Sequence, residues 1–161
     1  MLLCILGKSN AGKTTFVNHL EKKYKIKRVV TSTSRPKRPN EANGVDYHFY
    51  SYDTMRSDIN KGEYLEWNEF NSWLYGTKIS DIDINETSLI VLNPEGYKRL
   101  KQLYKDEVLC IYIKPSILTR IKRILIRDRG NYKEAFRRMR SDYIDFKDVD
   151  ADIIIKDFKL K

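Results

Sequence analysis

The sequence has few cysteines and no long hydrophobic run. Its 161 residues include only Cys4 and Cys110, each inside a short apolar segment. Two cysteines so placed predict reduced core residues of a cytoplasmic protein rather than a disulfide framework. No apolar stretch approaches the roughly 18 residues of a membrane span, and Met1–Leu6 is too short for a signal peptide and has no basic flank before it. We therefore expect neither a membrane span nor secretion.

Histidine is also scarce, and low-complexity tracts and internal repeats are absent. The two histidines, His19 and His48, stand apart from the cysteines, so no Cys/His spacing suggests a metal cluster. We interpret both as structural. Eleven Tyr, six Phe and two Trp, in contrast, are too many large apolar groups for a disordered chain. A single compact domain with its own core is expected at this length.

Positive charge is plentiful and unevenly placed. Of the formal net charge of +9, the segment from Lys114 to Arg140 carries +8, with ten basic residues opposed by Asp128 and Glu134. A localised positive field attracts polyanions, either nucleic acid or phosphorylated small molecules. A solvated helical face would give the same pattern, but the arginines in this window favour planar, bidentate contacts with phosphate.

Strand-like and helix-like patterns alternate along most of the chain. Apolar segments predict buried strands, and apolar residues at a helical spacing predict the helices between them. The pattern indicates an α/β sandwich of three layers with a mostly parallel sheet. The stretch 32–85 breaks the alternation and resembles an inserted lobe. Strands are predicted at 2–6, 29–31, 45–50, 64–70, 89–92, 108–113 and 152–155, and helices near 12–24, 51–61, 94–104, 116–129 and 133–146.

The first buried strand runs directly into a phosphate-binding motif. Gly7–Thr14 has the spacing G-x-x-x-x-G-K-T and precedes an amphipathic helix, so the strand and helix that the motif requires are both present. The glycines permit a tight turn, and the start of the helix aims its positive dipole end at a bound phosphate. The predicted ATP-binding residues are Gly7, Lys8, Ser9, Asn10, Ala11, Gly12, Lys13, Thr14 and Thr15.

Two residues of this motif have predicted chemical roles. Lys13 is expected to reach the β- and γ-phosphates, and the Thr14 hydroxyl is expected to bind Mg²⁺ together with the ATP phosphates. Mg²⁺ is the only metal that the sequence implies.

A second candidate phosphate site follows the predicted strand 29–31. Arg35 and Arg38 stand three positions apart with a proline between them, and Tyr47 follows in the same segment. Such a pair can grip one phosphate dianion. Two arginines in a loop are weak evidence by themselves, because a solvated loop also carries them.

The surrounding residues make a family resemblance specific. The segment 31–49, TSTSRPKRPNEANGVDYHF, resembles the T-[ST]-R-x-x-R-x-x-E-x-x-G-x-D-Y-x-F pattern of guanylate kinases. EYLEW at 63–67 and LYGT at 74–77 are similar to the next signature of that family, and the likeness extends from the phosphate loop to the last strand.

The resemblance implies phosphoryl transfer from ATP to GMP or dGMP by direct in-line attack, without a covalent intermediate. It implies a core of 1–31, 86–113 and 149–161, an acceptor-binding lobe of 32–85 and a lid region of 114–148. The lid arginines would be Arg123, Arg127 and Arg138, closing over the triphosphate. Acting together, Lys13, Arg35 and these three would form the catalytic set.

The same resemblance assigns the acceptor site. Thr31, Arg35, Arg38, Tyr47 and Tyr75 would hold the acceptor phosphate. Glu66 and Thr77 would read the guanine edge, since a carboxylate can accept hydrogen bonds from guanine N1–H and N2–H₂ that adenine cannot offer. Asn93 stands where the family has the second acid of a D-x-D pair and would also face the base.

Departures from the family pattern leave alternatives open. The pair of acids is replaced by Val91 and Asn93, which predicts looser base selection and weaker metal binding. A kinase of the same fold acting on another nucleoside monophosphate, or a non-catalytic binding module of this fold, would fit those changes. The expected partners are ATP and GMP or dGMP, without a membrane or nucleic acid; the sequence does not indicate an oligomeric state.

On the predicted lid helix, the expected core-facing side is formed by Ile117, Ile121, Ile124 and Leu125.

Overall fold

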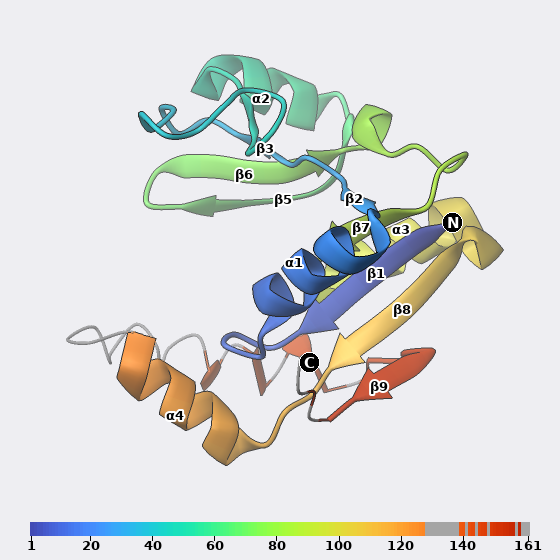
Figure 1. Cartoon of the computed structure of the whole chain (residues 1–161). Coiled ribbons are helices and arrows are strands. Elements are labelled where there is room, and N and C mark those ends of the chain that lie inside the picture. The colour runs from blue at the N-terminus through green and yellow to red at the C-terminus, as the bar shows by residue number, and fades with distance from the viewer. Residues whose placement is uncertain (128–138, 141, 144, 148, 157, 159–161) are drawn as a thin grey trace. The chain divides into compact units, whose positions relative to one another are not determined.

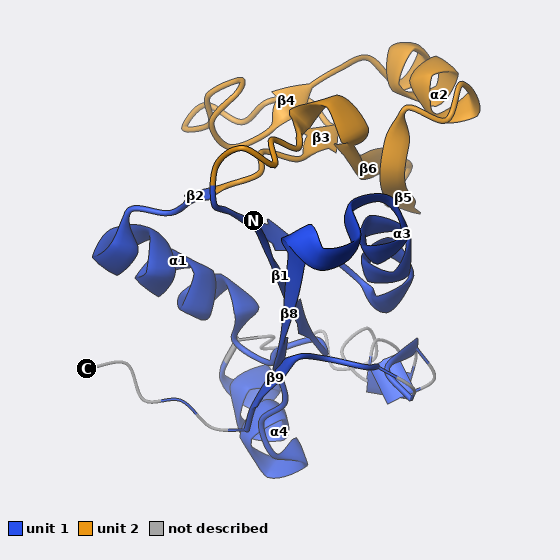
Figure 2. Ribbon diagram, turned by 90° about the vertical axis from the view of Figure 1, so that its right-hand side faces the viewer, with its two compact units in different colours: residues 1–27, 87–161 blue, residues 28–86 orange. Residues whose placement is uncertain are grey.

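The computed structural model describes residues 1–127, 139, 140, 142, 143, 145–147, 149–156 and 158. The chain divides into two compact units, coloured separately in Figure 2. One unit contains residues 1–27 and 87–161, and the other contains residues 28–86.

The first unit is built on a five-stranded sheet (Figure 1). Strand β1 pairs in parallel with both β7 and β8, and β8 pairs in parallel with β9. The predicted α/β class with a mostly parallel sheet is therefore confirmed. The strands in spatial order are β2 (Lys27–Arg28), β7 (Ser88–Val91), β1 (Leu2–Gly7), β8 (Val108–Ile113) and β9 (Ile153–Ile155).

The centre of this sheet is hydrophobic on both faces. All six residues of β1 are buried, as the unbroken apolar run predicts for a central parallel strand. Leu3 and Ile5 pack in one cluster with Val17 of the first helix and with Ile113 of β8. Each fully buried Leu or Ile side chain stabilises the fold by about 1.5–3 kcal/mol, so this cluster anchors the loop that leaves β1.

Helices flank the strands of this unit. Helix α1 (Lys13–Tyr24) and helix α3 (Pro94–Tyr104) both contact β1, and α4 (Ile117–Arg127) follows β8. These three agree with the predicted helices over the described residues. The helix expected at 133–146 lies mostly outside the described residues.

The second unit holds a four-stranded sheet and one helix. Helix α2 (Tyr52–Asn60) begins after Ser51, whose side chain caps it by accepting a hydrogen bond from the Thr54 N–H. The strand order is β4-β3-β6-β5, with β4 parallel to β3 and the other pairs antiparallel. The strands are β3 (Ser32–Thr33), β4 (His48–Phe49), β5 (Tyr64–Phe70) and β6 (Trp73–Lys78).

The β5–β6 hairpin closes through a two-residue turn. Asn71 and Ser72 have φ values of 52° and 61°, and Phe70 pairs with Trp73 across the turn. Positive φ at both central residues is typical of the type I′ turn, whose twist matches that of the flanking strands. This turn sets the register in which Glu66 and Thr77 become cross-strand neighbours.

Two predicted strands differ from the structure. The strand expected at 29–31 is wrong: β2 ends at Arg28 and β3 begins at Ser32, because the chain leaves one sheet here and enters another. Of the strand expected at 45–50, only His48–Phe49 pairs, and Val45 lies exposed in the preceding loop.

Candidate active site

The phosphate loop connects the end of β1 to the start of α1. Gly7 is the last residue of the strand, and Gly12 caps the helix with φ of 100°. Asn10, between them, also adopts a left-handed conformation with φ of 60°. A Cβ added at Gly12 would lie 3.0 Å from Arg123 Nη1, so this position combines positive φ with close packing. The positive φ favours glycine at this position, because a side chain would be strained there.

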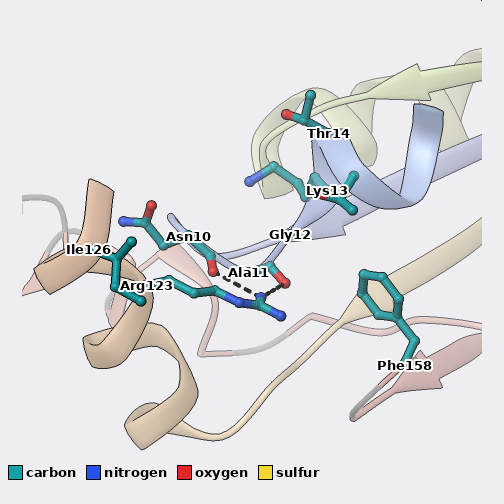
Figure 3. Close-up of a pocket in the computed structure, with 9 residues that line it drawn as sticks. Asn10, Ala11, Gly12, Lys13, Thr14, Arg123, Ile126 and Phe158 are labelled. Atoms are coloured by element: carbon teal, nitrogen blue, oxygen red, sulfur yellow. Dashed lines mark hydrogen bonds between the residues drawn. The ribbon is translucent and has the colours of Figure 1, made fainter. Parts of the chain in front are cut away.

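A pocket of about 610 Å³ opens at the start of α1 (Figure 3). The last six of the nine predicted ATP-binding residues line it, whereas Gly7, Lys8 and Ser9 are not among the lining residues. Helix α4 and the segment after β9 supply the remaining walls. The lining residues are Asn10, Ala11, Gly12, Lys13, Thr14, Thr15, Arg123, Ile126 and Phe158.

Lys13 is folded back over the loop. Its Nζ donates hydrogen bonds to the carbonyl oxygens of Gly7 at 2.6 Å and of Lys8 at 3.4 Å. Burial lowers the pKa of this amine below its ordinary value. The ammonium is thus held at the mouth of a loop whose helix end is also positive, an arrangement that favours an anion.

Arg123 of α4 contacts the same loop from the opposite side. Its Nη1 donates to the carbonyl oxygens of Asn10 at 3.2 Å and Ala11 at 2.6 Å (Figure 3). Of the other two predicted lid arginines, Arg127 ends α4 with its side chain outside the described part, and Arg138 lies outside the described residues.

Two further residues of this region contact the loop and were not assigned a role from the sequence. Arg120 Nε donates to the Ser9 carbonyl at 2.9 Å, and Asp142 accepts from the Ser9 N–H at 2.9 Å. Arg120 also pairs with Asp142 at 2.6 Å. The sequence showed that 114–140 is rich in basic residues, but no local pattern singled out Arg120 or Asp142.

The predicted core-facing side of α4 is partly wrong. Ile124 is buried, but Ile117 and Leu125 are 61% and 55% exposed, while Arg120 is only 6% exposed. Hydropathy alone predicts that an arginine is exposed. Arg120 can be buried because it is paired with a residue distant in the sequence.

The second candidate phosphate site lies in the second unit. Arg35 donates from Nη2 and Nη1 to the two carboxylate oxygens of Glu41, at 2.8 and 3.0 Å. The Arg38 N–H donates to Glu41 Oε2 at 2.9 Å. Hydrogen bonding from Arg35 holds the pKa of Glu41 below its ordinary value. Glu41 thus contacts both Arg35 and Arg38. The family motif includes this glutamate, but the sequence analysis assigned it no role.

Aromatic residues surround the same guanidinium. Arg35 Cζ lies 5.6 Å from the ring centroid of Tyr47, and the rings of Tyr47 and Tyr75 are 6.3 Å apart. The pKa of Arg35 is raised, mainly by Glu41 and to a smaller degree by Tyr75. Thr31 is half-buried, and its carbonyl accepts the His48 N–H at 2.9 Å. The structure therefore brings together Arg35, Tyr47 and Tyr75, whereas Arg38 is exposed.

The residues expected to read the base form a polar pair on β5 and β6. The fully buried Thr77 donates its hydroxyl to Glu66 Oε1 at 2.8 Å. Beside them, a Cβ at Gly76 would lie 2.7 Å from the Glu66 carbonyl oxygen, so only glycine fits there. Asn93 belongs to the first unit, where its Oδ1 accepts the Gly96 N–H at 2.7 Å and caps α3.

A parallel sheet whose central strand runs through a G-x-x-x-x-G-K-T loop into a helix defines a P-loop nucleotide-binding protein. The family model described as guanylate kinase matches residues 1–160, and the chain belongs to the guanylate kinase family.

Individual relatives agree with the family match. A guanylate kinase of Thermotoga maritima is 36% identical over 139 residues, covering 83% of this chain and 66% of that protein. A guanylate kinase of Salinibacter ruber is 28% identical, covering 97% of this chain and 88% of that protein. The crystal structure of guanylate kinase from Anaplasma phagocytophilum has a TM-score of 0.67 at 20% identity and covers 99% of this chain and 77% of that one, which supports the fold.

None of the helices described is long and apolar enough to cross a membrane. In the same part of the chain, no three His, Cys, Asp or Glu side chains gather as a metal site.

Proposed function

We propose that this chain transfers the γ-phosphoryl group of ATP to GMP or dGMP by direct in-line attack. The observation that carries the proposal is the pocket at the start of α1, where Lys13, Arg123 and the helix end converge on one loop. Membership of the guanylate kinase family points to the same reaction. An oxygen of the acceptor phosphate is itself the nucleophile, so no covalent enzyme intermediate is needed.

The donor half of the reaction belongs to the phosphate loop. N–H groups at the start of α1 would bind the β- and γ-phosphates, and Lys13 would exchange its contact with the Gly7 carbonyl for phosphate oxygens. Arg123, with Arg127 and Arg138, would neutralise the charge that spreads over the transferring group. The proposed lid of 114–148 would exclude water, which otherwise accepts the phosphoryl group.

The residues at the loop fit a Mg²⁺ ion carried by the nucleotide. Thr14 is exposed and lines the pocket, so its hydroxyl can supply one ligand. Mg²⁺ at such sites keeps several waters and uses one or two protein ligands besides phosphate. When bound, it would offset the negative charge of the phosphate oxygens. Val91 and Asn93 supply no carboxylate, so we expect Thr14 to provide the protein ligand to Mg²⁺.

The acceptor half belongs to the proposed lobe of 32–85. Arg35, Arg38, Tyr47, Tyr75 and Thr31 would hold the acceptor phosphate, with Arg35 already ordered by Glu41. Glu66 would accept from the guanine N1–H and N2–H₂. Its carboxylate can accept several hydrogen bonds besides the one from Thr77. Asn93 would add a neutral contact to the base.

An acceptor panel tests the proposal. ADP release is measured with ATP, Mg²⁺ and each of GMP, dGMP, AMP, dTMP and dCMP. Turnover with GMP or dGMP is expected. Turnover only with dTMP or dCMP would identify a kinase of the same fold with another acceptor. No turnover with any acceptor, together with DNA binding that weakens steeply with salt, would identify a binding module.

We also propose a cytoplasmic location, which two buried free cysteines, Cys4 and Cys110, support.

A further inference from the structure

Arg120 of helix α4 and Asp142 hydrogen-bond with the N–H, hydroxyl and carbonyl groups of Ser9 in the phosphate loop. We propose that Arg120 and Asp142 are a positioning pair that sets the shape of the loop at Ser9 for ATP. The inference rests on ATP binding by the loop, which is part of the proposed function. Neither residue lines the pocket, so both act through Ser9 and its neighbours.

The contacts form a closed ring around Ser9. Its N–H donates to Asp142 Oδ2 at 2.9 Å, and its hydroxyl donates to Asp142 Oδ1 at 3.2 Å. Its carbonyl accepts from Arg120 Nε at 2.9 Å. Arg120 Nη2 then donates to Asp142 Oδ2 at 2.6 Å, which completes the ring. Three polar groups of one loop residue are therefore fixed by two side chains.

The pair is suited to a site for an anion. Arg120 and Asp142 are 6% and 8% exposed, so their charges interact with little screening by solvent. A carboxylate alone beside the loop would repel a triphosphate, but the paired arginine cancels its charge. The pair thus supplies hydrogen bonds to the loop and no net charge. Its own hydrogen bonds offset the desolvation of the two groups.

The adjacent residues show the same alignment. Lys8, which precedes Ser9, has its Nζ 5.6 Å from the ring centroid of Tyr143, which follows Asp142. Two successive loop residues therefore contact two successive residues of the later segment.

The loop needs such support. Asn10, next to Ser9, has a φ of 60°, a conformation that costs free energy in a non-glycine residue. Backbone of this kind persists when the surrounding contacts hold it. A loop already in its binding shape loses less conformational entropy when ATP binds. We therefore expect the contacts at Ser9 to increase the affinity of the loop for ATP.

The test uses a double variant that preserves net charge. Arg120→Met with Asp142→Leu removes the three hydrogen bonds that the pair makes with Ser9 and replaces the buried pair by apolar side chains, an exchange that proteins often tolerate. The Kd of ATP with Mg²⁺ is measured by calorimetry, and folding by thermal unfolding. The matched control is Lys78→Met with Asp58→Leu, which removes a 2.9 Å ion pair of the second unit. Arg120→Lys is a second variant, which keeps the charge but loses the Nε donor to Ser9.

A positioning role predicts that the double variant folds and binds ATP about tenfold more weakly or worse, since several hydrogen bonds that order the loop are lost. The control keeps the Kd of the unchanged protein. A folded double variant whose Kd stays within about twofold would overturn the proposal, because a purely structural pair would behave that way. If the double variant does not fold, Arg120→Lys decides by the same threshold.

These outcomes are separate from the outcome for the reaction itself. If the unchanged protein binds ATP but phosphorylates no GMP, the proposed function fails while the Kd comparison still decides the role of the pair. If GMP is phosphorylated, the double variant should raise the KM for ATP and leave the KM for GMP within about twofold, a split that general loss of stability would not produce.

Discussion

The hydroxyl of Thr77 donates a 2.8 Å hydrogen bond to Glu66 Oε1 across the β5–β6 pair. The bond fixes one carboxylate oxygen from a fully buried position on the neighbouring strand. It therefore orients the side chain that we propose reads guanine. Orientation by a buried donor is the usual way in which a binding site limits the conformations of a charged side chain.

Replacing Glu66 tests base reading. Glu66→Gln puts an amide NH₂ where guanine needs an acceptor, so kcat/KM for GMP should fall by about 100-fold, as expected when a hydrogen bond to a charged group becomes a mismatch. Thr77→Val, which removes only the orienting donor, should give a fall of about tenfold. Steady-state rates with GMP and AMP measure both. Full activity of Glu66→Gln would contradict the assigned role.

Replacing Lys13 tests the phosphate loop. Lys13→Met removes the ammonium that faces the pocket and should lower kcat by about 1,000-fold or more, because transition-state charge loses a direct partner. Lys22→Met, in the last turn of the same helix, is the matched control and should leave kcat unchanged. If Lys13→Met turned over near the unchanged rate, the loop would not be the donor site.

The Arg35–Glu41 pair makes a graded prediction. Arg35→Met should raise the KM for GMP by about 100-fold and leave the KM for ATP unchanged, since a charge-assisted contact to the acceptor phosphate is lost. Glu41→Gln weakens the bidentate pair that orients Arg35 and the contact to the Arg38 N–H, and it should give a smaller rise, about fivefold. Lys37→Met is an exposed control in the same loop. Equal rises for Lys37→Met and Arg35→Met would show only a general effect of charge.

Asn93 permits a test of stability and selectivity together. Asn93→Ala removes the cap of α3 and should lower the free energy of unfolding by about 1 kcal/mol. Asn93→Asp keeps an acceptor at the cap and adds a charge that the helix start favours, so stability should be retained or rise slightly. Urea unfolding measures both changes.

Asn93→Asp also restores the acid that the family pattern has there. It should sharpen the preference for GMP over the other acceptors in the panel. An unchanged preference among the acceptors would contradict the proposed contact between Asn93 and the base.

The strand, loop and helix of the donor site were predictable because their information is local. An unbroken apolar run predicted β1, the glycine spacing predicted the turn, and the amphipathic segment after the loop predicted α1. The strand predicted at 29–31 failed, since β-branched residues favour strands but do not reveal where a chain leaves a sheet.

The contacts of α4 were not predictable from its own sequence. Hydropathy placed Ile117 and Leu125 in the core, but both are exposed, whereas the charged Arg120 is buried. Its partner Asp142 is 22 positions away, and the Ser9 carbonyl is 111 positions away. Glu41 lay within the recognised motif, but its bidentate hold on Arg35 became evident only from the geometry.

By itself, the sequence determined the phosphate loop, the mostly parallel sheet and the family, because short motifs and hydrophobic periods act over a few residues. The tertiary structure alone decided which charges are buried and paired, as at Ser9 with Arg120 and Asp142. The burial of a charge depends on partners that folding brings together from distant positions, and no local pattern encodes that distance.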